Sequence, residues 1–288
     1  GEVPHPFSGT SDGGGRRIRG LRILREDETG YELGLFGRID GGTVKHLTVE
    51  AEDICGMDRT GVLAGSVTGD AVLYDITVSG YVSAASSSAE AFAGGVAGRV
   101  DGCGGRATVE NCRAEGIVVR NESRDGGTGG IAGMVQEADL ADNEVYTMDG
   151  SYDRIYGRGY TGGIVGIMED SCLYNSYADG TIGGNGSRAA GGIVGRYESG
   201  NLILARFAGE IGRTGSGTLA REGTFIGTRE DRDTFTYGME KADNLAYLYT
   251  NSAVKARNVC GSGLDGDNTF SSAAHVGYWT DNGRKYVT

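Results

Sequence analysis

The chain has 288 residues, with 54 glycines, only two prolines and a formal net charge of −12 at pH 7. Glycine does not recur at every third position and proline is scarce, which excludes collagen, while the regular short apolar runs argue against disorder. The acidic balance disfavours a nucleic-acid partner, and no stretch approaches the roughly 18 apolar residues of a membrane span.

A short apolar word bounded by glycines recurs seven times along the chain. Its copies are Gly34–Ile39, Gly61–Val67, Gly94–Val100, Gly129–Val135, Gly162–Met168, Gly191–Tyr197 and Gly223–Thr228. Successive copies lie between 28 and 35 residues apart, when they are aligned on the anchoring glycines Gly37, Gly65, Gly98, Gly133, Gly166, Gly195 and Gly227. A period that varies by a few residues indicates strands of fixed length joined by variable loops. We expect these glycines to let the backbone bend at a corner.

A second word follows each first word by about ten residues, and its apolar residues alternate with polar ones. Its copies are Val44–Val49, Leu73–Val78, Val109–Ala114, Leu140–Val145, Leu173–Ala178, Ile203–Ala208 and Ala242–Tyr247, with an extra copy at Ile18–Ile23. Alternation is the period of a β-strand, and no window of twelve residues carries a helical stripe. The sequence therefore predicts an all-β chain.

The repeat predicts a right-handed parallel β-helix, a solenoid of about seven to eight coils over residues 1–255, because one such unit cannot bury its own apolar face. A β-sandwich is the alternative, but it gives no reason for a fixed period. The predicted inward residues are Leu35, Leu47, Leu63, Ile76, Val96, Cys112, Ile131, Ile164, Ile193 and Phe225. Residues 256–288 hold the only tryptophan, Trp279, and read as two strands that cap the last coil or link to a following domain. Phe7 and Val3 are candidates for the cap at the other end.

Both words resemble the GLUG repeat of bacterial surface proteins. The segment Phe7–Ile23, followed by Gly34–Ile39, is similar to the start of the glycine-rich region that precedes the catalytic domain in Gram-positive IgA-cleaving zinc metalloproteases. The resemblance covers about residues 7–250, and it implies a secreted or cell-surface bacterial protein. The five cysteines, which have no C-x-x-C spacing, depart from the usual composition of that group. Cysteine does not settle the compartment, and a bond between Cys103 and Cys112 is left open.

The sequence lacks two motifs of common catalytic sites, the zinc-protease motif and the P-loop. The protease chemistry implied by the resemblance needs H-E-x-x-H, but His5, His46 and His275 are followed by Pro6, Leu47 and Val276. There is no Gly-Lys dipeptide for a phosphate-binding P-loop. We expect no catalytic residue, no bound metal and no cofactor in this segment, and any protease active site would lie outside it.

A polar residue precedes the central residue of most second words. These residues are His46, Asp75, Asn111, Asp142, Asn175 and Asn244. Stacked coils would place them one above another, either as a ladder of side chains that cap the turns or as an acidic groove that binds sugar or calcium. We expect the capping ladder.

Two acidic stretches raise further alternatives. Thr228–Asp233 is the densest charged cluster, and carboxylates on adjacent coils could serve a polysaccharide-active enzyme, a glycoside hydrolase or lyase. Asp265–Asn268 has oxygen ligands around a glycine, which suits calcium, but Val276 occupies the twelfth position, where an EF-hand loop needs glutamate. We expect Thr228–Asp233 to be a solvated loop and Asp265–Asn268 to be a simple turn.

The insertion Val145–Gly163 is rich in tyrosine and arginine. Exposed tyrosines could stack on sugar rings or grip a protein partner, although they could equally cover the solenoid flank as a small satellite core. The candidate ligand-binding residues are Tyr146, Tyr152, Tyr156, Tyr160, Arg154 and Arg158.

We therefore expect a noncatalytic spacer and recognition domain, a monomeric rod in a larger protease or adhesin. Its partner would be a host or matrix glycoprotein, for example an immunoglobulin, or a glycan, with no insertion into a membrane. A polysaccharide-active enzyme and a purely structural stalk are the competing hypotheses.

Overall fold

The computed structural model describes residues 5–25, 30–87, 91–147, 155–183, 186–211, 222–223, 225–229, 245–246, 249–251, 279–281 and 284–287. Within these ranges every regular element is a β-strand, which confirms the all-β prediction. None of this part forms a helix long and apolar enough to cross a membrane.

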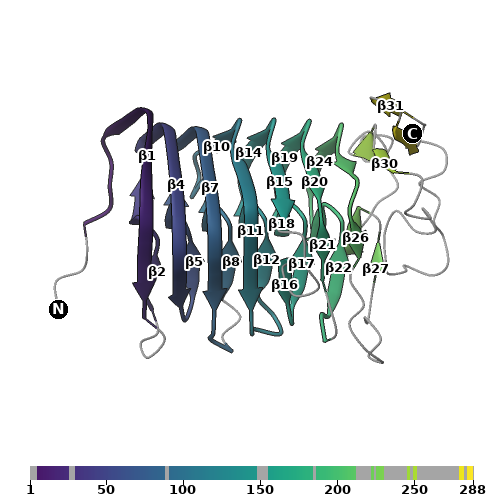
Figure 1. The fold of residues 1–288 in the computed structure, drawn as a ribbon, viewed down its shortest axis with the longest axis horizontal. Coiled ribbons are helices and arrows are strands. Elements are labelled where there is room, and N and C mark those ends of the chain that lie inside the picture. The colour runs from purple at the N-terminus through teal and green to yellow at the C-terminus, as the bar shows by residue number, and fades with distance from the viewer. Residues whose placement is uncertain are drawn as a thin grey trace.

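Apart from two antiparallel strands near the C-terminus, the strands form three parallel sheets that run along a rod (Figure 1). Sheet I contains β1 (Thr10–Leu24), β4 (Thr43–Gly56), β7 (Val72–Ala84), β10 (Ala107–Glu110), β11 (Arg113–Asn121), β14 (Ala138–Ala141), β15 (Glu144–Thr147), β16 (Ile155–Gly157), β19 (Ser171–Tyr174), β20 (Tyr177–Asp179), β21 (Thr181–Ile182), β24 (Gly200–Ile203), β25 (Arg206–Phe207), β26 (Glu210–Ile211), β29 (Leu245–Ala246) and β30 (Tyr249–Asn251). Sheet II contains β2 (Glu32–Leu33), β5 (Arg59–Gly61), β8 (Phe92–Gly94), β12 (Gly127–Gly129), β17 (Tyr160–Gly162), β22 (Ala189–Gly191) and β27 (Glu222–Gly223). Sheet III contains β3 (Phe36–Asp40), β6 (Ala64–Thr68), β9 (Ala97–Asp101), β13 (Ala132–Gln136), β18 (Val165–Glu169), β23 (Val194–Tyr197) and β28 (Ile226–Arg229).

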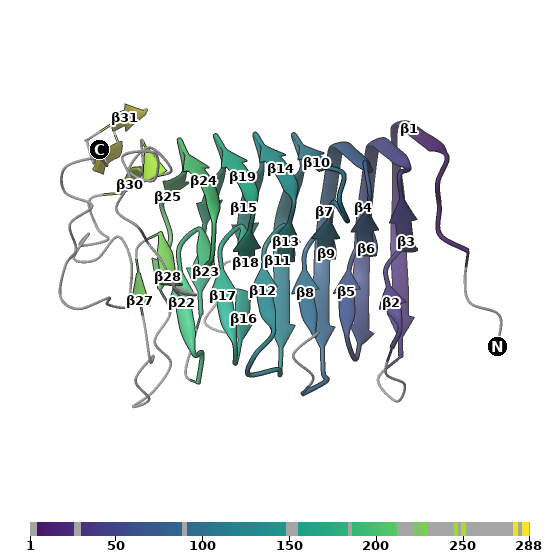
Figure 2. The same ribbon diagram turned by 180° about the vertical axis from the view of Figure 1, so that it is seen from behind.

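Each coil passes from sheet I to sheet II, then to sheet III and back to sheet I, so the predicted β-solenoid is confirmed (Figure 2). Corresponding positions pair in register from coil to coil, as Val67 does with Ile39 on one side and Val100 on the other. The seven copies of the first word supply the seven strands of sheet III, and from the first to the last of these the chain makes six full turns. The copies of the second word lie along sheet I, with Leu245 and Ala246 the described part of the last copy.

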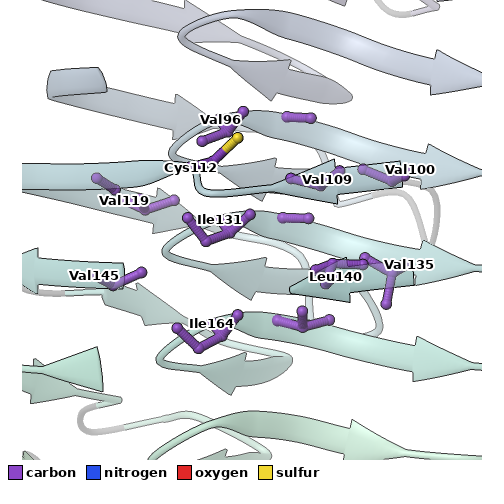
Figure 3. Packing of buried hydrophobic residues seen from close by; sticks show 14 of the residues in the cluster. Val96, Val100, Val109, Cys112, Val119, Ile131, Val135, Leu140, Val145 and Ile164 are labelled. Carbon is purple, nitrogen blue, oxygen red and sulfur yellow. The ribbon is translucent and has the colours of Figure 1, made fainter. Parts of the chain in front are cut away.

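The core is a continuous column of apolar side chains between the three sheets (Figure 3). Nine of the ten predicted inward residues are buried, and Cys112 lies among them beside Val96 and Ile131. Leu35 is only partly buried because it belongs to the first coil and has no earlier coil stacked on it. Cys103, Cys112 and Cys172 are free thiols, so Cys103 and Cys112 are not bonded to each other.

The repeated glycines have a different role from the expected one. Their φ angles are not left-handed, so they do not serve as bends. At all of these positions after Gly37, sheet III instead passes so close to sheet II that no side chain fits: a Cβ on Gly133 would lie 2.6 Å from the amide nitrogen of Ala93 and 2.9 Å from the carbonyl oxygen of Gly127, both in sheet II. We call this line of contact between sheets II and III the glycine junction.

Both ends carry some of the expected elements. Phe7 forms a bridge to Ile39, and its ring lies 5.0 Å from that of Phe36 at the first coil. At the other end, β31 (Trp279–Asp281) and β32 (Arg284–Val287) pair as antiparallel strands, and β32 also pairs with β30. Val3 and most of residues 252–288, including Asp265–Asn268, lie outside the described residues.

Candidate functional site

The second word bends sheet I at one residue in each coil, and this corner organises the site. The corner residue has a left-handed φ of 51° at His46, 53° at Asp75, 52° at Asn111, 55° at Asp142 and 45° at Asn175. Asn and Asp tolerate this conformation because their short polar side chains bond locally. In the following coil Leu204 holds the same conformation, with a φ of 55°. Asn244 lies outside the described residues.

The side chains of these corner residues stack from coil to coil, and we call them the ladder. Asn111 Nδ2 donates to Asp75 Oδ1 over 3.3 Å, and Asn175 Nδ2 donates to Asp142 Oδ1. The predicted ladder therefore exists, but its hydrogen bonds run between side chains of neighbouring coils rather than to the backbone.

Backbone groups at the corner are satisfied from inside by the residue after the ladder. The buried amide of Asn143 accepts a hydrogen bond from the Cys112 nitrogen over 3.0 Å and donates to the Val109 carbonyl over 2.9 Å. Since buried backbone groups need partners, Asn143 fixes the turn while the ladder residues stay available on the surface.

A polar groove of about 320 Å³ lies along the ladder. The residues that line it are Asp75, Thr77, Asn111, Cys112, Arg113, Asp142, Glu144, Asn175 and Arg206. Within it, Arg113 Nε lies 3.1 Å from Glu144 Oε2, and outside it the same atom lies 3.0 Å from Glu115 Oε1. The Glu115 contact belongs to the adjoining strand surface. Arg206 Nη2 donates to Asn175 Oδ1 over 3.4 Å.

Aromatic side chains flank this groove on the outer face of sheet I. The rings of Tyr146 and Tyr177 lie 5.5 Å apart, with the Arg113 guanidinium 4.9 Å from the Tyr146 ring and Arg206 5.8 Å from the Tyr177 ring. Tyr174, directly before a ladder residue, is 42% exposed. Partial burial raises the pKa of the Tyr146 phenol, so this hydroxyl stays protonated at neutral pH.

This arrangement suits binding better than acid–base or nucleophilic chemistry. Cys112 is the thiol nearest the groove, but burial raises its pKa to about 12, which keeps it in the unreactive thiol form. In the part of the chain that the structure describes, no group of three or more His, Cys, Asp or Glu side chains is arranged to hold a metal ion. The groove offers carboxylate and amide acceptors, guanidinium donors and ring faces.

The structure divides the predicted tyrosine-rich site into three places. Tyr146 joins the groove. Tyr156 and Arg158 lie at the opposite end of the sheet I strands, on β16 and just after it. Tyr160 is only 1% exposed and packs with Phe92, Ile167 and Ala189, so it belongs to a satellite core. Tyr152 and Arg154 lie outside the described residues.

Sequence reasoning missed Arg113, Glu144, Tyr177 and Arg206, although a signal for them was present. Each stands two positions after a corner residue, and the strand alternation that turns the intervening residue inward turns these outward. Three of the four come from copies of the second word that lie outside the Val145–Gly163 insertion.

No protein-family model matches the chain. Halomucin from Haloquadratum walsbyi is 34% identical over 82 residues, which are 28% of this chain and 1% of that protein. A crystal structure from Bacteroides ovatus that carries the provisional designation immunoglobulin A1 protease matches with a TM-score of 0.53 and 19% identity, covering 76% of this chain and 68% of the other. At this identity the match shows a shared β-solenoid fold.

Proposed function

We propose that the chain is a noncatalytic spacer and recognition domain of a secreted or cell-surface bacterial protein, and that it binds the glycans of a host or matrix glycoprotein. The observation that carries the proposal is the ladder groove. It combines hydrogen-bonding side chains with exposed rings on a rigid surface.

The chemistry of the groove fits a polyhydroxylated ligand. Asp75, Asp142 and Glu144 offer acceptors for sugar hydroxyls, and Arg113 donates. The faces of Tyr174 and Tyr177 can cover the apolar face of a sugar ring, because tyrosine joins a broad hydrophobic surface to a polar tip. Equivalent positions recur after about 4.8 Å with polar, charged or aromatic side chains, so an extended chain of sugars can follow the rod axis.

The comparisons support the proposed setting of the domain within a larger protein. The Bacteroides ovatus protein shares the solenoid, and its designation as an immunoglobulin A1 protease agrees with a role beside a peptidase domain. Halomucin is far longer than this chain, which agrees with a role as one segment of a large surface protein, such as an adhesin.

The test is binding of the full chain to an array of host and matrix glycans. Arg113→Ala with Tyr177→Ala should weaken binding at least tenfold, because it removes a donor and a stacking face from the groove. The matched control is Arg22→Ala with Tyr31→Ala, which removes the same residue types from the first coil and should leave binding unchanged. Equal affinity in both double variants would overturn the proposal. A chain that retains no glycan or glycoprotein would be a structural stalk.

A polysaccharide-active enzyme is the second candidate, and the ladder gives it one specific observation. Asp75 and Asp142 stand two coils apart, about 10 Å, close to the carboxyl separation of inverting glycosidases. Each, however, accepts a hydrogen bond from the asparagine one coil further along. Reproducible turnover of a polysaccharide that disappears in Asp142→Asn would replace the binding proposal with this one.

A further inference from the structure

A second pocket lies at the other end of the sheet I strands, where three successive coils turn into sheet II. The loops that form it follow β11, β16 and β21. It has a volume of about 360 Å³ and is lined by Arg124, Asp125, Arg158, Gly186 and Arg188. We call it the arginine pocket.

The backbone that carries these arginines is fixed by the stacking of the coils. The Arg158 nitrogen donates to the Asn121 carbonyl over 3.0 Å, and the Arg188 nitrogen donates to the Arg158 carbonyl over 2.9 Å. Two of the three arginines are therefore held on adjacent coils, at the spacing of a parallel sheet.

Buried polar side chains hold the loops themselves. Asn121 is fully buried, donates to the carbonyls of Ala91 and Gly127, and accepts from the Ser123 nitrogen. Ser187 is 2% exposed and donates to the Gly157 carbonyl over 2.6 Å. The pocket is thus preorganised, which lowers the entropic cost of binding.

The pocket carries an excess of positive charge on a chain whose net charge is −12. Arg158 pairs with Glu122 at 2.8 Å, and Arg188 pairs with Asp125 at 2.7 Å. Arg124 makes no ion pair with any residue that the structure describes, and its side chain is exposed. Among the described residues, three arginines thus line the pocket together with one carboxylate, Asp125, while Glu122 lies against Arg158.

One glycine keeps a side of the pocket open next to an aromatic hydroxyl. Gly186 has a left-handed φ of 91°, and a Cβ there would lie 3.6 Å from the Tyr156 hydroxyl oxygen. A larger residue would be strained and would stand between the pocket and Tyr156. The predicted pair Tyr156 and Arg158 is thus brought together with Arg124 and Arg188.

We propose that the arginine pocket binds the oxyanion of an acidic polysaccharide, the carboxylate of a uronic acid or a sulfate ester. Guanidinium groups present paired N–H donors that match the oxygens of such anions, and these charge-assisted bonds are among the stronger hydrogen bonds in proteins. The volume falls within the range of small-ligand sites, about 300–1,000 Å³.

The two carboxylates on the rim favour a sugar over an acidic peptide. Glu122 and Asp125 can accept hydrogen bonds from the hydroxyls that accompany each charge on a polysaccharide. An acidic peptide such as polyglutamate carries no hydroxyls and offers these carboxylates only its backbone N–H groups as donors. The pocket is thereby distinct from the ladder groove in its place and in the charge of its ligand.

The test measures binding of the full chain to four probes: polygalacturonate, heparin, dextran and poly-L-glutamate. Polygalacturonate or heparin should bind in a salt-sensitive manner, and the stronger of the two identifies carboxylate or sulfate as the preferred group. Dextran, which is uncharged, should not displace the acidic polysaccharide from this pocket. Arg124→Ala with Arg158→Ala should weaken the acidic polysaccharide at least tenfold, with the melting temperature recorded to confirm folding.

The matched control is Arg16→Ala with Arg22→Ala, which removes two exposed arginines from β1 and lowers the net charge by the same amount. Equal weakening in both double variants would overturn the proposal in favour of unspecific attraction, as would an absence of binding to either acidic polysaccharide. Equal or tighter binding of poly-L-glutamate would replace it with an acidic-peptide site. The groove variant Arg113→Ala with Tyr177→Ala should bind the acidic probe normally, so failure of the groove proposal and failure of this one can be told apart.

Discussion

The glycine junction and the ladder both recur once per coil, but they restrict the sequence in opposite ways. At the junction, sheet III lies against the backbone of sheet II, and a single added carbon would collide with main-chain atoms. At the ladder only the backbone conformation is fixed, and the chain fills the position with His46, Asp75, Asn111 or even Leu204.

The difference explains where binding can develop in this solenoid. Where every side chain is excluded, only glycine fits. The same sequence then recurs in each coil, and no functional group is presented to a ligand. A position that fixes only φ leaves the side chain free to vary, and it turns that side chain towards solvent. We therefore expect ligands to bind at the corners and loops, whereas the junction only supports the fold.

The largest expected effect comes from adding a methyl group at the junction. Gly133→Ala should destabilise the chain by about 3 kcal/mol or more, since the nearest atoms are all backbone and cannot move aside as a side chain would. Gly9→Ala is the control, because the nearest atoms there are 3.6 Å away on the Phe7 ring. Urea unfolding followed by circular dichroism measures both. Equal urea midpoints for the two variants would show that the backbone at the junction moves apart to accept the methyl group.

The next effect lies directly behind the ladder. Asn143→Ala should cost about 1–3 kcal/mol, because it leaves the Cys112 amide and the Val109 carbonyl buried without these partners. Asp142→Asn, one residue away on the exposed ladder, should change the free energy of unfolding by less than about 0.5 kcal/mol. A comparable loss of unfolding free energy in the two variants would mean that the ladder side chains also support the fold.

A smaller effect concerns the outer rim of the junction in the first coils, where Glu32 joins Arg38, Ser66 and Arg59. Burial alone would raise the pKa of Glu32, but hydrogen bonds from Arg38, Ser66 and Arg59 and the charge of Arg38 outweigh it and lower the pKa below 4.5. The resulting stability is present above pH 4.5 and is lost as the pH falls through the folded-state pKa.

Glu32→Gln should therefore cost about 1–2 kcal/mol at pH 7, and the gap to the parent chain should narrow as the pH drops below 4.5. Thermal unfolding at a series of pH values provides the measurement, with the exposed Glu210→Gln as control. A gap that stays constant down to pH 3 would show that ionised Glu32 does not support the rim.

The smallest expected effect is a gain in stability at the ladder. Leu204 holds a left-handed φ of 55°, which is unfavourable for a leucine and easier for asparagine. Leu204→Asn should raise the free energy of unfolding by about 0.5–1 kcal/mol. Leu204→Ala removes the same side chain without relieving the backbone, so it should bring no gain. A destabilised asparagine variant would show that packing of Leu204 matters more than its backbone.

The solenoid could be predicted from the sequence because both words report local rules that repeat. The recurring apolar position of the first word identified Leu63 and Ile131 as core residues, and strand alternation in the second word identified Ile76, without knowledge of their neighbours. The reason for the glycines could not be predicted in this way. Their neighbours belong to another sheet and another coil, and sequence alone does not show how closely two backbones approach.

The candidate sites were less predictable for the same reason. The insertion Val145–Gly163 is continuous in sequence, yet the fold sends Tyr146 to the ladder groove, Tyr156 to the arginine pocket and Tyr160 to a satellite core. The arginine pocket joins side chains from three coils, and Arg124 and Arg188 are 64 positions apart. Adjacency along the chain is a poor guide to adjacency across a stack.

Because the coils pair in register, each coil adds the same fixed length to the rod. Gly129 pairs with Gly162, and Ala132 pairs with Val165, so equivalent atoms recur one layer further along the rod. Loss or duplication of one whole repeat would bring together surfaces that already match, and it would alter the rod by about 4.8 Å. Evolution can thus adjust the reach of this domain in fixed steps without designing a new core.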